Sequence, residues 1–312
     1  MIKVTEFIEL NGTRLYVSIR SKRVKAPLLL YLHGGPGDAA LPLILKYNKQ
    51  LEDDFTVVIL EQRGAGKSYY PFKKDEKIAI DLFVEDLYEL SQYLLRRFEQ
   101  EKLYLVGHSW GSVLGLKFAK RHPELLYKYI GVGQVVNMKK SSKIALDFAK
   151  ESCLKSGKDL IAEKLEKIDP AYTQETWLND LLLVTGEVIK HRGSYYGKTN
   201  YNGLIADFIL SRHYNLNDLI KRQKGALQAI KYLWPELMMV NFETDLKFNV
   251  PVVFIQGRGD YHVSSELVYE YYQNIKSCKE FFWLENSCHF PQWEEADVFN
   301  KVIGLLQKKN WQ

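Results

Sequence analysis

Residues 103–111 read Leu-Tyr-Leu-Val-Gly-His-Ser-Trp-Gly, an apolar run that leads directly into the pattern Gly-x-Ser-x-Gly. This pattern is typical of a buried strand that turns sharply into a helix and presents one serine, here Ser109, for nucleophilic attack. Bulky side chains two positions to either side would clash in such a turn, and the chain has glycine at both 107 and 111. Residues 112–122 then favour a helix that ends before Pro123.

A serine in this pattern could also be a helix cap in an ordinary glycine-rich turn, so other segments must decide between the two interpretations. Residues 28–32, Leu-Leu-Leu-Tyr-Leu, lead into the second glycine-rich turn, His-Gly-Gly-Pro-Gly, at 33–37. Such a turn allows backbone N–H groups to approach a developing oxyanion closely. We expect one donor to be the N–H of Gly35, with Gly34 as the alternative, and the other to be the N–H of Trp110.

Two later strand ends supply an acid and a base. Asp260 follows the apolar residues 252–256 and His289 follows residues 281–284, with room for one helix and one strand between them. Both side chains should therefore emerge beside Ser109 at one edge of a parallel sheet, the acid orienting the base. His108 and His262 are competing histidines; we interpret His108 as a packing residue and His262 as a pocket residue.

The pattern along the chain predicts an α/β fold with a mostly parallel central sheet flanked by helices. Residues 5–20 favour an opening hairpin around Asn11-Gly12, and buried strands are expected at about 27–32, 56–61, 103–107, 128–133, 251–256 and 280–284. A helix is expected over 81–98. From 136 to 245 the strand pattern disappears, so we predict a core of residues 1–135 and 246–312 with a helical cap, or lid, inserted at 136–245.

Three motifs in this order resemble the proline iminopeptidase group of α/β-hydrolases: residues 33–37, Glu-Gln-Arg-Gly-Ala-Gly-Lys-Ser at 61–68, and residues 107–111. The resemblance covers about 5–135 and 246–305, and it implies an α/β-hydrolase fold with the triad Ser109, Asp260 and His289. The chain has Glu61 where the family usually has aspartate, and Ser112 where it often has glycine.

The resemblance also implies that carboxylates in the cap hold the free amino group of the substrate. The stretch 208–214 is similar to the family's cap segment, but Ser211 and Arg212 occupy the region where the acid is expected. Glu187 and Glu243 are left as the candidate amine-binding residues, and Gly34 is a further candidate for substrate binding.

These features lead us to expect a serine hydrolase that acts through an acyl-enzyme. The favoured activity is an aminopeptidase of proline iminopeptidase type on small peptides or aminoacyl amides. One alternative is a carboxylesterase or amidase for small acyl esters, and another is a non-catalytic ligand-binding protein on the same fold. No cofactor is expected. Gly-Lys-Ser at 66–68 is not a phosphate-binding loop, because the required glycine five places before Gly66 is replaced by Glu61.

Composition limits the partners and the setting. The net charge of +5 over 312 residues is mild and shows no basic cluster for nucleic acid or a membrane, so we expect a small-molecule or short-peptide substrate. The three cysteines have no metal-binding spacing, and no metal is expected. The N-terminus has no apolar signal core, which favours a cytoplasmic setting. The oligomeric state is left open.

Overall fold

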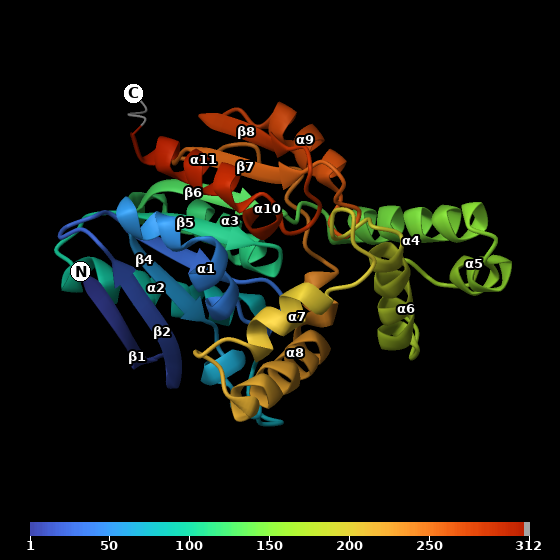
Figure 1. Cartoon of the computed structure of the whole chain (residues 1–312), viewed down its shortest axis with the longest axis horizontal. Helices are drawn as coiled ribbons and strands as arrows, with labels where there is room; N and C mark the ends of the chain where they lie inside the picture. The colour runs from blue at the N-terminus through green and yellow to red at the C-terminus, as the bar shows by residue number, and fades with distance from the viewer. Residues whose placement is uncertain (309–312) are drawn as a thin grey trace.

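One twisted sheet forms the centre of the molecule. The computed structural model describes residues 1–308, and in these residues eight strands lie in the order β1-β2-β4-β3-β5-β6-β7-β8 (Figure 1). The first two strands form an antiparallel hairpin, β2 is antiparallel to β4, and all later pairs are parallel. The predicted α/β fold is confirmed. The strands are β1 (Ile2–Leu10), β2 (Thr13–Ser21), β3 (Leu28–Leu32), β4 (Thr56–Glu61), β5 (Leu103–His108), β6 (Leu126–Val132), β7 (Val252–Gly257) and β8 (Lys279–Leu284).

Helices cover both faces of the sheet, because the strands are apolar on both sides. In β3, Leu28, Leu30 and Leu32 pack on one face with α2, α3 and α9, while Leu29 and Tyr31 pack on the other with α1 and α11. Near-continuous apolar runs are what a parallel sheet buried between two helical layers requires. The core helices are α1 (Leu41–Tyr47), α2 (Ile80–Arg97), α3 (Trp110–Arg121), α9 (Ser265–Asn274), α10 (Pro291–Glu294) and α11 (Ala296–Lys308), with short 3-10 turns η1 (Lys49–Asp53), η2 (Gly66–Ser68) and η3 (Pro123–Leu125).

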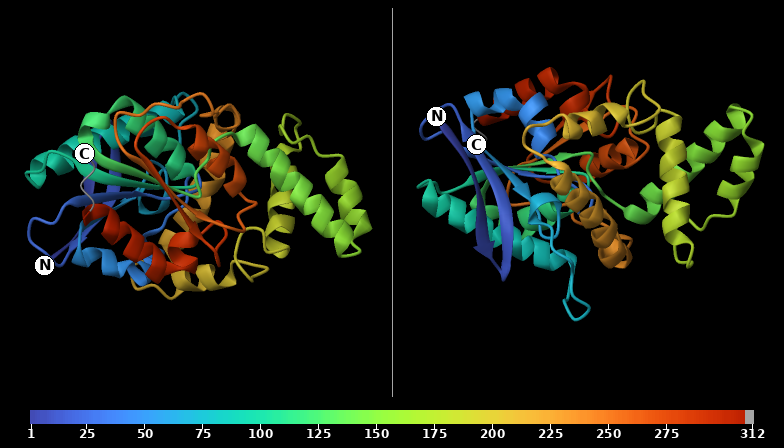
Figure 2. Two further views of the ribbon diagram at one scale, coloured as in Figure 1. Left: turned by 90° about the horizontal axis from the view of Figure 1, so that it is seen from above. Right: turned by 60° about the horizontal axis from the view of Figure 1, so that its bottom comes forward.

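A helical segment lies between the adjacent parallel strands β6 and β7. Its helices α4 to α6 project beyond the edge of the sheet, whereas α7 and α8 lie against the core (Figures 1 and 2). Polar contacts attach the second group to the core: Lys67 Nζ lies 2.6 Å from Asp218 Oδ2 on α8. The helices are α4 (Met138–Lys155), α5 (Asp159–Glu166), α6 (Trp177–Lys190), α7 (Asn202–Ile209) and α8 (Leu216–Leu237).

Most predicted elements are found within two residues of their expected positions. The hairpin turns at Asn11 and Gly12, and α2 lies one residue before the expected range. The helix after the serine begins at Trp110 rather than at 112, because the N–H of Ser112 already donates to the carbonyl of Ser109, at 2.8 Å.

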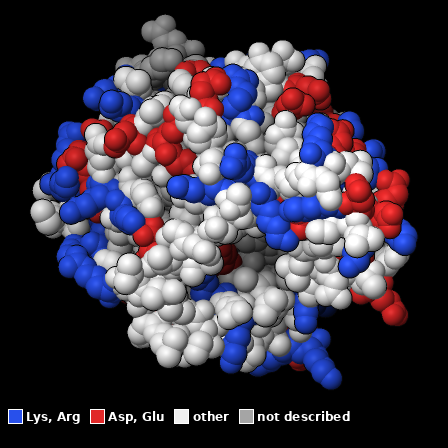
Figure 3. Space-filling view, turned by 45° about the vertical axis from the view of Figure 1, so that its right-hand side comes forward, with Lys and Arg blue, Asp and Glu red and all other residues white. Residues whose placement is uncertain are grey.

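The molecular surface carries charges of both signs. On the face drawn in Figure 3, basic and acidic side chains are intermixed, and a hollow near its middle is bordered mostly by uncharged side chains. Among residues 1–308, none of the helices is both long and apolar enough to cross a membrane.

The turn between β5 and α3 is tightly packed against neighbouring backbone. Ser109 has a φ of 53°, a left-handed conformation that is strained for a residue with a side chain. A Cβ on Gly107 would lie 2.5 Å from the carbonyl oxygen of Gly111, and one on Gly111 would lie 2.5 Å from that of Leu32. The predicted need for glycine at both positions is therefore confirmed.

Replacing Gly111 by alanine should destabilise the protein, because the new methyl group meets backbone that cannot move aside. We expect Gly111→Ala to lower the free energy of unfolding by about 1–3 kcal/mol, as overpacking in a core does. Gly186→Ala is the matched control, since a Cβ there on α6 meets nothing within 4 Å. The control should raise stability by about 0.5–1 kcal/mol. Urea denaturation of both variants measures this; equal effects would contradict the packing argument.

Candidate active site

Ser109, Asp260 and His289 come together at the carboxyl ends of the parallel strands. Ser109 follows β5, Asp260 follows β7 and His289 follows β8, and all three side chains are buried. His289 Nε2 lies 3.0 Å from Ser109 Oγ, and His289 Nδ1 lies 2.8 Å from Asp260 Oδ2. When Nδ1 carries the proton, it donates to the carboxylate and Nε2 accepts from the serine hydroxyl. This is the geometry of a nucleophile, a base and an orienting acid.

The surroundings of His289 and Asp260 suit these roles. Burial lowers the pKa of His289, which keeps the imidazole uncharged and able to accept a proton. Burial raises the pKa of Asp260, while the backbone N–H groups of Val263 and His262 lower it by donating to Oδ1, each at 2.9 Å. These two bonds fix the carboxylate so that Oδ2 faces the imidazole.

Two backbone segments, the turn at 33–37 and the start of α3, lie next to Ser109 where an oxyanion would form. Trp110 is the first residue of α3, so its N–H has no carbonyl partner within the helix. Gly35, with a φ of 126°, lines one cavity together with Ser109 and Trp110. Gly34 packs so closely that a Cβ on it would lie 3.2 Å from Cβ of Ser109. The structure thus brings Gly34, Gly35 and Trp110 next to the serine.

The side chain of Gln62 joins the two glycine-rich turns. Its Nε2 donates to the carbonyl of His33 at 2.9 Å, and its Oε1 accepts from Trp110 Nε1 at 2.8 Å. The next residue is fixed by a buried ion pair, in which Arg63 Nε and Nη2 contact the two oxygens of Asp86 at 2.8 and 2.7 Å. In the sequence this segment is recognisable only as a family motif, and its positioning role was not predicted.

The side chain of Glu61 holds the start of the segment 61–68 in place through two hydrogen bonds. Its side chain is fully buried at the end of β4 and accepts hydrogen bonds from the backbone N–H of Lys67 and the hydroxyl of Tyr214. Tyr214 lies between α7 and α8, so this carboxyl links the core to the inserted helices. Glu61, at which the chain departs from the family pattern, is therefore hydrogen-bonded both to the core and to the inserted helical segment.

Neither competing histidine reaches the serine hydroxyl in a hydrogen bond. His108 is buried, and its Nε2 donates to the carbonyl of His289 at 2.9 Å, which fits the packing role that we expected. The ring of His262 lies 4.5 Å from that of His289, centroid to centroid, and lines both cavities beside Ser109.

The loop that follows α6 contacts both the acid and the base segments. The N–H of His289 donates to the carbonyl of Ser194 at 3.1 Å, and that of Tyr261 to Gly193 at 2.8 Å. Glu294 on α10 accepts from three backbone N–H groups, those of Tyr196, Cys288 and Phe290. Sequence reasoning missed Glu294, because its link to Tyr196 spans 98 residues.

Two cavities meet at Ser109, each of about 210 Å³, and both are also lined by Gly35 and His262. One is walled by apolar side chains from α4, α6 and α8, including Met138, Leu181, Val184, Val188 and Trp234. The other lies toward α1 and α7 and contains Asp38, whose two oxygens are held by the guanidinium of Arg222. Among the described residues that line the two cavities, Asp38 is the one carboxylate.

The two candidate amine-binding glutamates are not among these lining residues. Glu187 is buried on α6 and its Oε1 is paired with Lys190, while Glu243 lies 2.6 Å from Lys140 Nζ. The predicted grouping of either residue with Ser109 is therefore not found, because each carboxylate is already paired elsewhere. Asp38 could have been found from sequence, since it directly follows the turn at 33–37.

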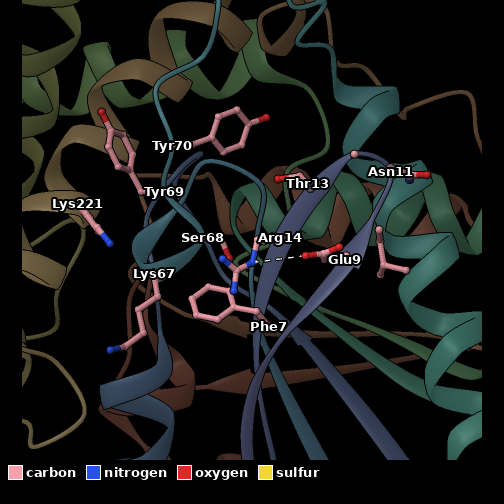
Figure 4. Close-up of a pocket in the computed structure, with 12 residues that line it drawn as sticks. Phe7, Glu9, Asn11, Thr13, Arg14, Lys67, Ser68, Tyr69, Tyr70 and Lys221 are labelled. Atoms are coloured by element: carbon pink, nitrogen blue, oxygen red, sulfur yellow. Dashed lines mark ion pairs between the residues drawn. The ribbon is translucent and has the colours of Figure 1, made fainter.

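A larger cavity, of about 720 Å³, lies away from the serine. It is lined by the β1–β2 hairpin and by residues 67–70, and Arg14 points toward Glu9 across its edge, with Nε 3.9 Å from Oε1 (Figure 4). None of Ser109, Asp260 or His289 lines it. Size alone would thus misplace the candidate site.

Comparison with known proteins agrees with this fold. Residues 27–175 match the family described as alpha/beta hydrolase fold. A probable aminopeptidase, YbaC, of Bacillus subtilis is 33% identical over 308 residues, covering 97% of this chain and 96% of that protein. A proline iminopeptidase of Heyndrickxia coagulans is 26% identical over 310 residues, covering 96% of each.

A solved structure shares the fold along almost the whole chain. It is a proline iminopeptidase-related protein from Thermus thermophilus, with a TM-score of 0.65 and 18% identity, covering 99% of this chain and 98% of that one. At this level of identity the likeness supports the fold alone.

The buried carboxyl of Glu61 should make stability depend on pH. Burial raises its pKa to about 7, while the bonds from Tyr214 and Lys67 lower it. The folded protein therefore binds this proton more tightly than the unfolded chain, whose pKa is near 4.5, so stability is lost as pH rises from 4.5 to 7. The shift corresponds to about 3 kcal/mol.

Glu61→Gln removes this titration, so the stability of the variant relative to the native protein should rise with pH by up to about 3 kcal/mol across this window. Urea denaturation of both proteins from about pH 5 to pH 8 measures the difference. Any effect of the substitution on stability that does not depend on pH cancels when the differences at two pH values are compared. A stability difference that does not change with pH would contradict the raised pKa of Glu61.

Proposed function

This chain belongs to the α/β-hydrolase fold family, and we propose that it is a serine hydrolase that acts through an acyl-enzyme. The observation that carries the proposal is the hydrogen-bonded series from Ser109 through His289 to Asp260, with distances of 3.0 and 2.8 Å. The strained backbone of Ser109 supports it further, because such strain is concentrated at functional residues. A ligand-binding protein without turnover has no need of this arrangement.

In the acylation step, Ser109 Oγ attacks the substrate carbonyl carbon while His289 Nε2 takes the hydroxyl proton. The charged imidazolium is stabilised by Asp260, to which its Nδ1–H donates. The carbonyl oxygen becomes an oxyanion that the N–H groups of Gly35 and Trp110 stabilise; one such donor typically contributes about 100- to 1000-fold in rate. The bond to the leaving group then breaks, and the imidazolium gives its proton to the departing amine or alcohol.

In the deacylation step, His289 takes a proton from water, which attacks the acyl carbon. The second tetrahedral intermediate collapses, the imidazolium of His289 gives its proton to Ser109 Oγ, and the acid product leaves. The mechanism calls for neither a metal nor an organic cofactor. Gln62 contributes by holding the two segments that carry the oxyanion donors at a fixed distance from each other.

For the substrate, we propose a small peptide or aminoacyl amide with a free amino end. The full-length similarity to proteins named as aminopeptidase and proline iminopeptidase supports this class. Such an amine needs a carboxylate near Ser109, and Asp38 is the lining residue that can provide one. Each Asp38 oxygen accepts one bond from Arg222, which orients the carboxylate and leaves acceptor capacity for an ammonium group.

A second candidate is an esterase or amidase for small acyl groups. The observation that favours it is the apolar cavity beside Ser109, which among residues 1–308 is lined by no charged side chain. An acyl chain would fill this cavity without any partner for an amine. The two candidates share the mechanism and differ in whether the polar cavity binds the substrate's amino group.

One experiment tests the mechanism and separates the two candidates. We would measure kcat and KM for a proline anilide, other aminoacyl anilides and a short-chain acyl ester with the native protein, Ser109→Ala, Asp38→Asn and Glu243→Gln. Ser109→Ala should lose at least about 1000-fold in kcat on every substrate that is turned over. Glu243→Gln is the control, because it removes a carboxylate outside both cavities.

For an aminopeptidase, Asp38→Asn should raise KM for the anilides at least about tenfold and leave the ester unchanged, because only the anilides carry an amine. Glu243→Gln should alter neither. Hydrolysis of the ester alone would favour the esterase. Full activity of Ser109→Ala would contradict the serine mechanism itself.

A further inference from the structure

Three potential metal ligands converge in the helical segment, away from the serine. Cys153 near the end of α4, Glu187 on α6 and His191, which directly follows α6, present one ligand atom each to a common point. The first two side chains are buried and His191 is only partly exposed, with 14% of its side chain accessible. The mechanism proposed above uses none of them.

The separations fit one small ion. Cys153 Sγ lies 3.5 Å from Glu187 Oε2 and 3.7 Å from His191 Nε2, and the last two atoms are 3.6 Å apart. A point equidistant from the three atoms therefore lies about 2.1 Å from each. Zinc–nitrogen and zinc–oxygen bonds are about 2.0–2.2 Å long and zinc–sulfur bonds about 2.3 Å, so small shifts of the side chains would complete the coordination.

The ligand types select the metal. A thiolate with an imidazole and a carboxylate suits Zn²⁺, whereas Mg²⁺ and Ca²⁺ prefer sites made of oxygen alone. Binding would break the S–H bond of Cys153, form a zinc–sulfur bond and release the proton to solvent. Water from the side of His191 would take the fourth position.

The surrounding charges leave one oxygen of Glu187 available. Lys190 binds Oε1, whereas the contacts with Cys153 and His191 are made by Oε2. Lys158 lies 3.7 Å from Oε2, but 39% of its side chain is exposed, so it can turn toward solvent when an ion arrives. The same groups without an ion form a network of hydrogen bonds and ion pairs between α4 and α6.

From this geometry we propose that Cys153, Glu187 and His191 form a Zn²⁺ site that ties α4 to α6. Its effect would be structural, because none of the three residues lines either cavity at Ser109. Helix α4 contributes Met138 to that wall and α6 contributes Val184 and Val188, so the ion would fix the spacing between the two sides. The inference concerns the chain's own residues and does not depend on the proposed hydrolase activity.

Cobalt substitution tests the site, because Co²⁺ bound to a thiolate in a tetrahedral site gives a near-ultraviolet charge-transfer band. The reduced, metal-free full chain would be titrated with Co²⁺ alone, and Zn²⁺ would then be added as competitor. We expect the band to saturate at one Co²⁺ per chain and to disappear with one equivalent of Zn²⁺. Zn²⁺ should also raise the melting temperature.

The variants identify the ligands. Cys153→Ser should abolish the band, and Cys278→Ser is the matched control, because Cys278 is an exposed free cysteine outside the cluster. His191→Ala provides a second test at a partly exposed position if Cys153→Ser does not fold. It should weaken Co²⁺ binding by at least about tenfold, since even groups behind metal ligands contribute that much.

Absence of the band in the native protein would overturn the proposal, and the three residues would then be an ion-pair network only. A band that persists in Cys153→Ser, or that is lost in Cys278→Ser, would also overturn it. Hydrolysis assays on the same samples keep the two proposals distinct, because a protein that hydrolyses anilides without binding Co²⁺ would remove the zinc site alone.

Discussion

The candidate site depends on one backbone constraint, the turn that holds Ser109 at a positive φ between β5 and α3. The turn fits only because the chain has no side chain at 107 or 111, where backbone oxygens approach to 2.5 Å of a Cβ position. One of these oxygens belongs to Leu32, at the end of β3, so Ser109 and the turn at 33–37 are packed against each other. Gln62, directly after β4, then bridges both. Segments at the ends of three neighbouring strands thus fix Ser109 and the proposed oxyanion donors as one unit.

The acid and the base are held by a different set of contacts, which come partly from the helical segment. The loop around Ser194 accepts backbone hydrogen bonds from the segments that carry Asp260 and His289, and Glu294 adds three more backbone contacts. Helices α7 and α8 are attached to the core through Glu61 and Lys67. The inserted helices therefore do two things: they wall the substrate cavities and they support the geometry of the triad. On this account, specificity is decided mainly by α4, α6, α7 and α8.

What could be predicted from sequence follows from how local each signal is. The sheet, the glycine turn and the grouping of Ser109, Asp260 and His289 follow from apolar runs and from the residues just after them, because parallel strands end at one edge. Glu187 and Glu243 do not line the cavities at Ser109, and each is paired with a lysine: Glu187 with Lys190 on the same helix, and Glu243 with Lys140 on α4. The pairing of Glu243 depends on contacts between distant segments, which the sequence does not encode locally. Packing between α4 and α6 likewise brings Cys153 next to Glu187 and His191. The signal for Asp38 in the sequence is its position directly after the turn at 33–37, a turn that we interpreted only as a source of oxyanion donors.

The central claim is that Ser109 becomes acylated during turnover. The most direct measurement is to quench the reaction with an activated acyl ester in acid during the first turnovers and to map the modified peptide by mass spectrometry. The account predicts one acyl group per chain, on the peptide containing Ser109, and none on Ser109→Ala treated in the same way. Acylation of another residue, or turnover by the native protein with no covalent intermediate at Ser109 even when deacylation is slowed, would contradict it.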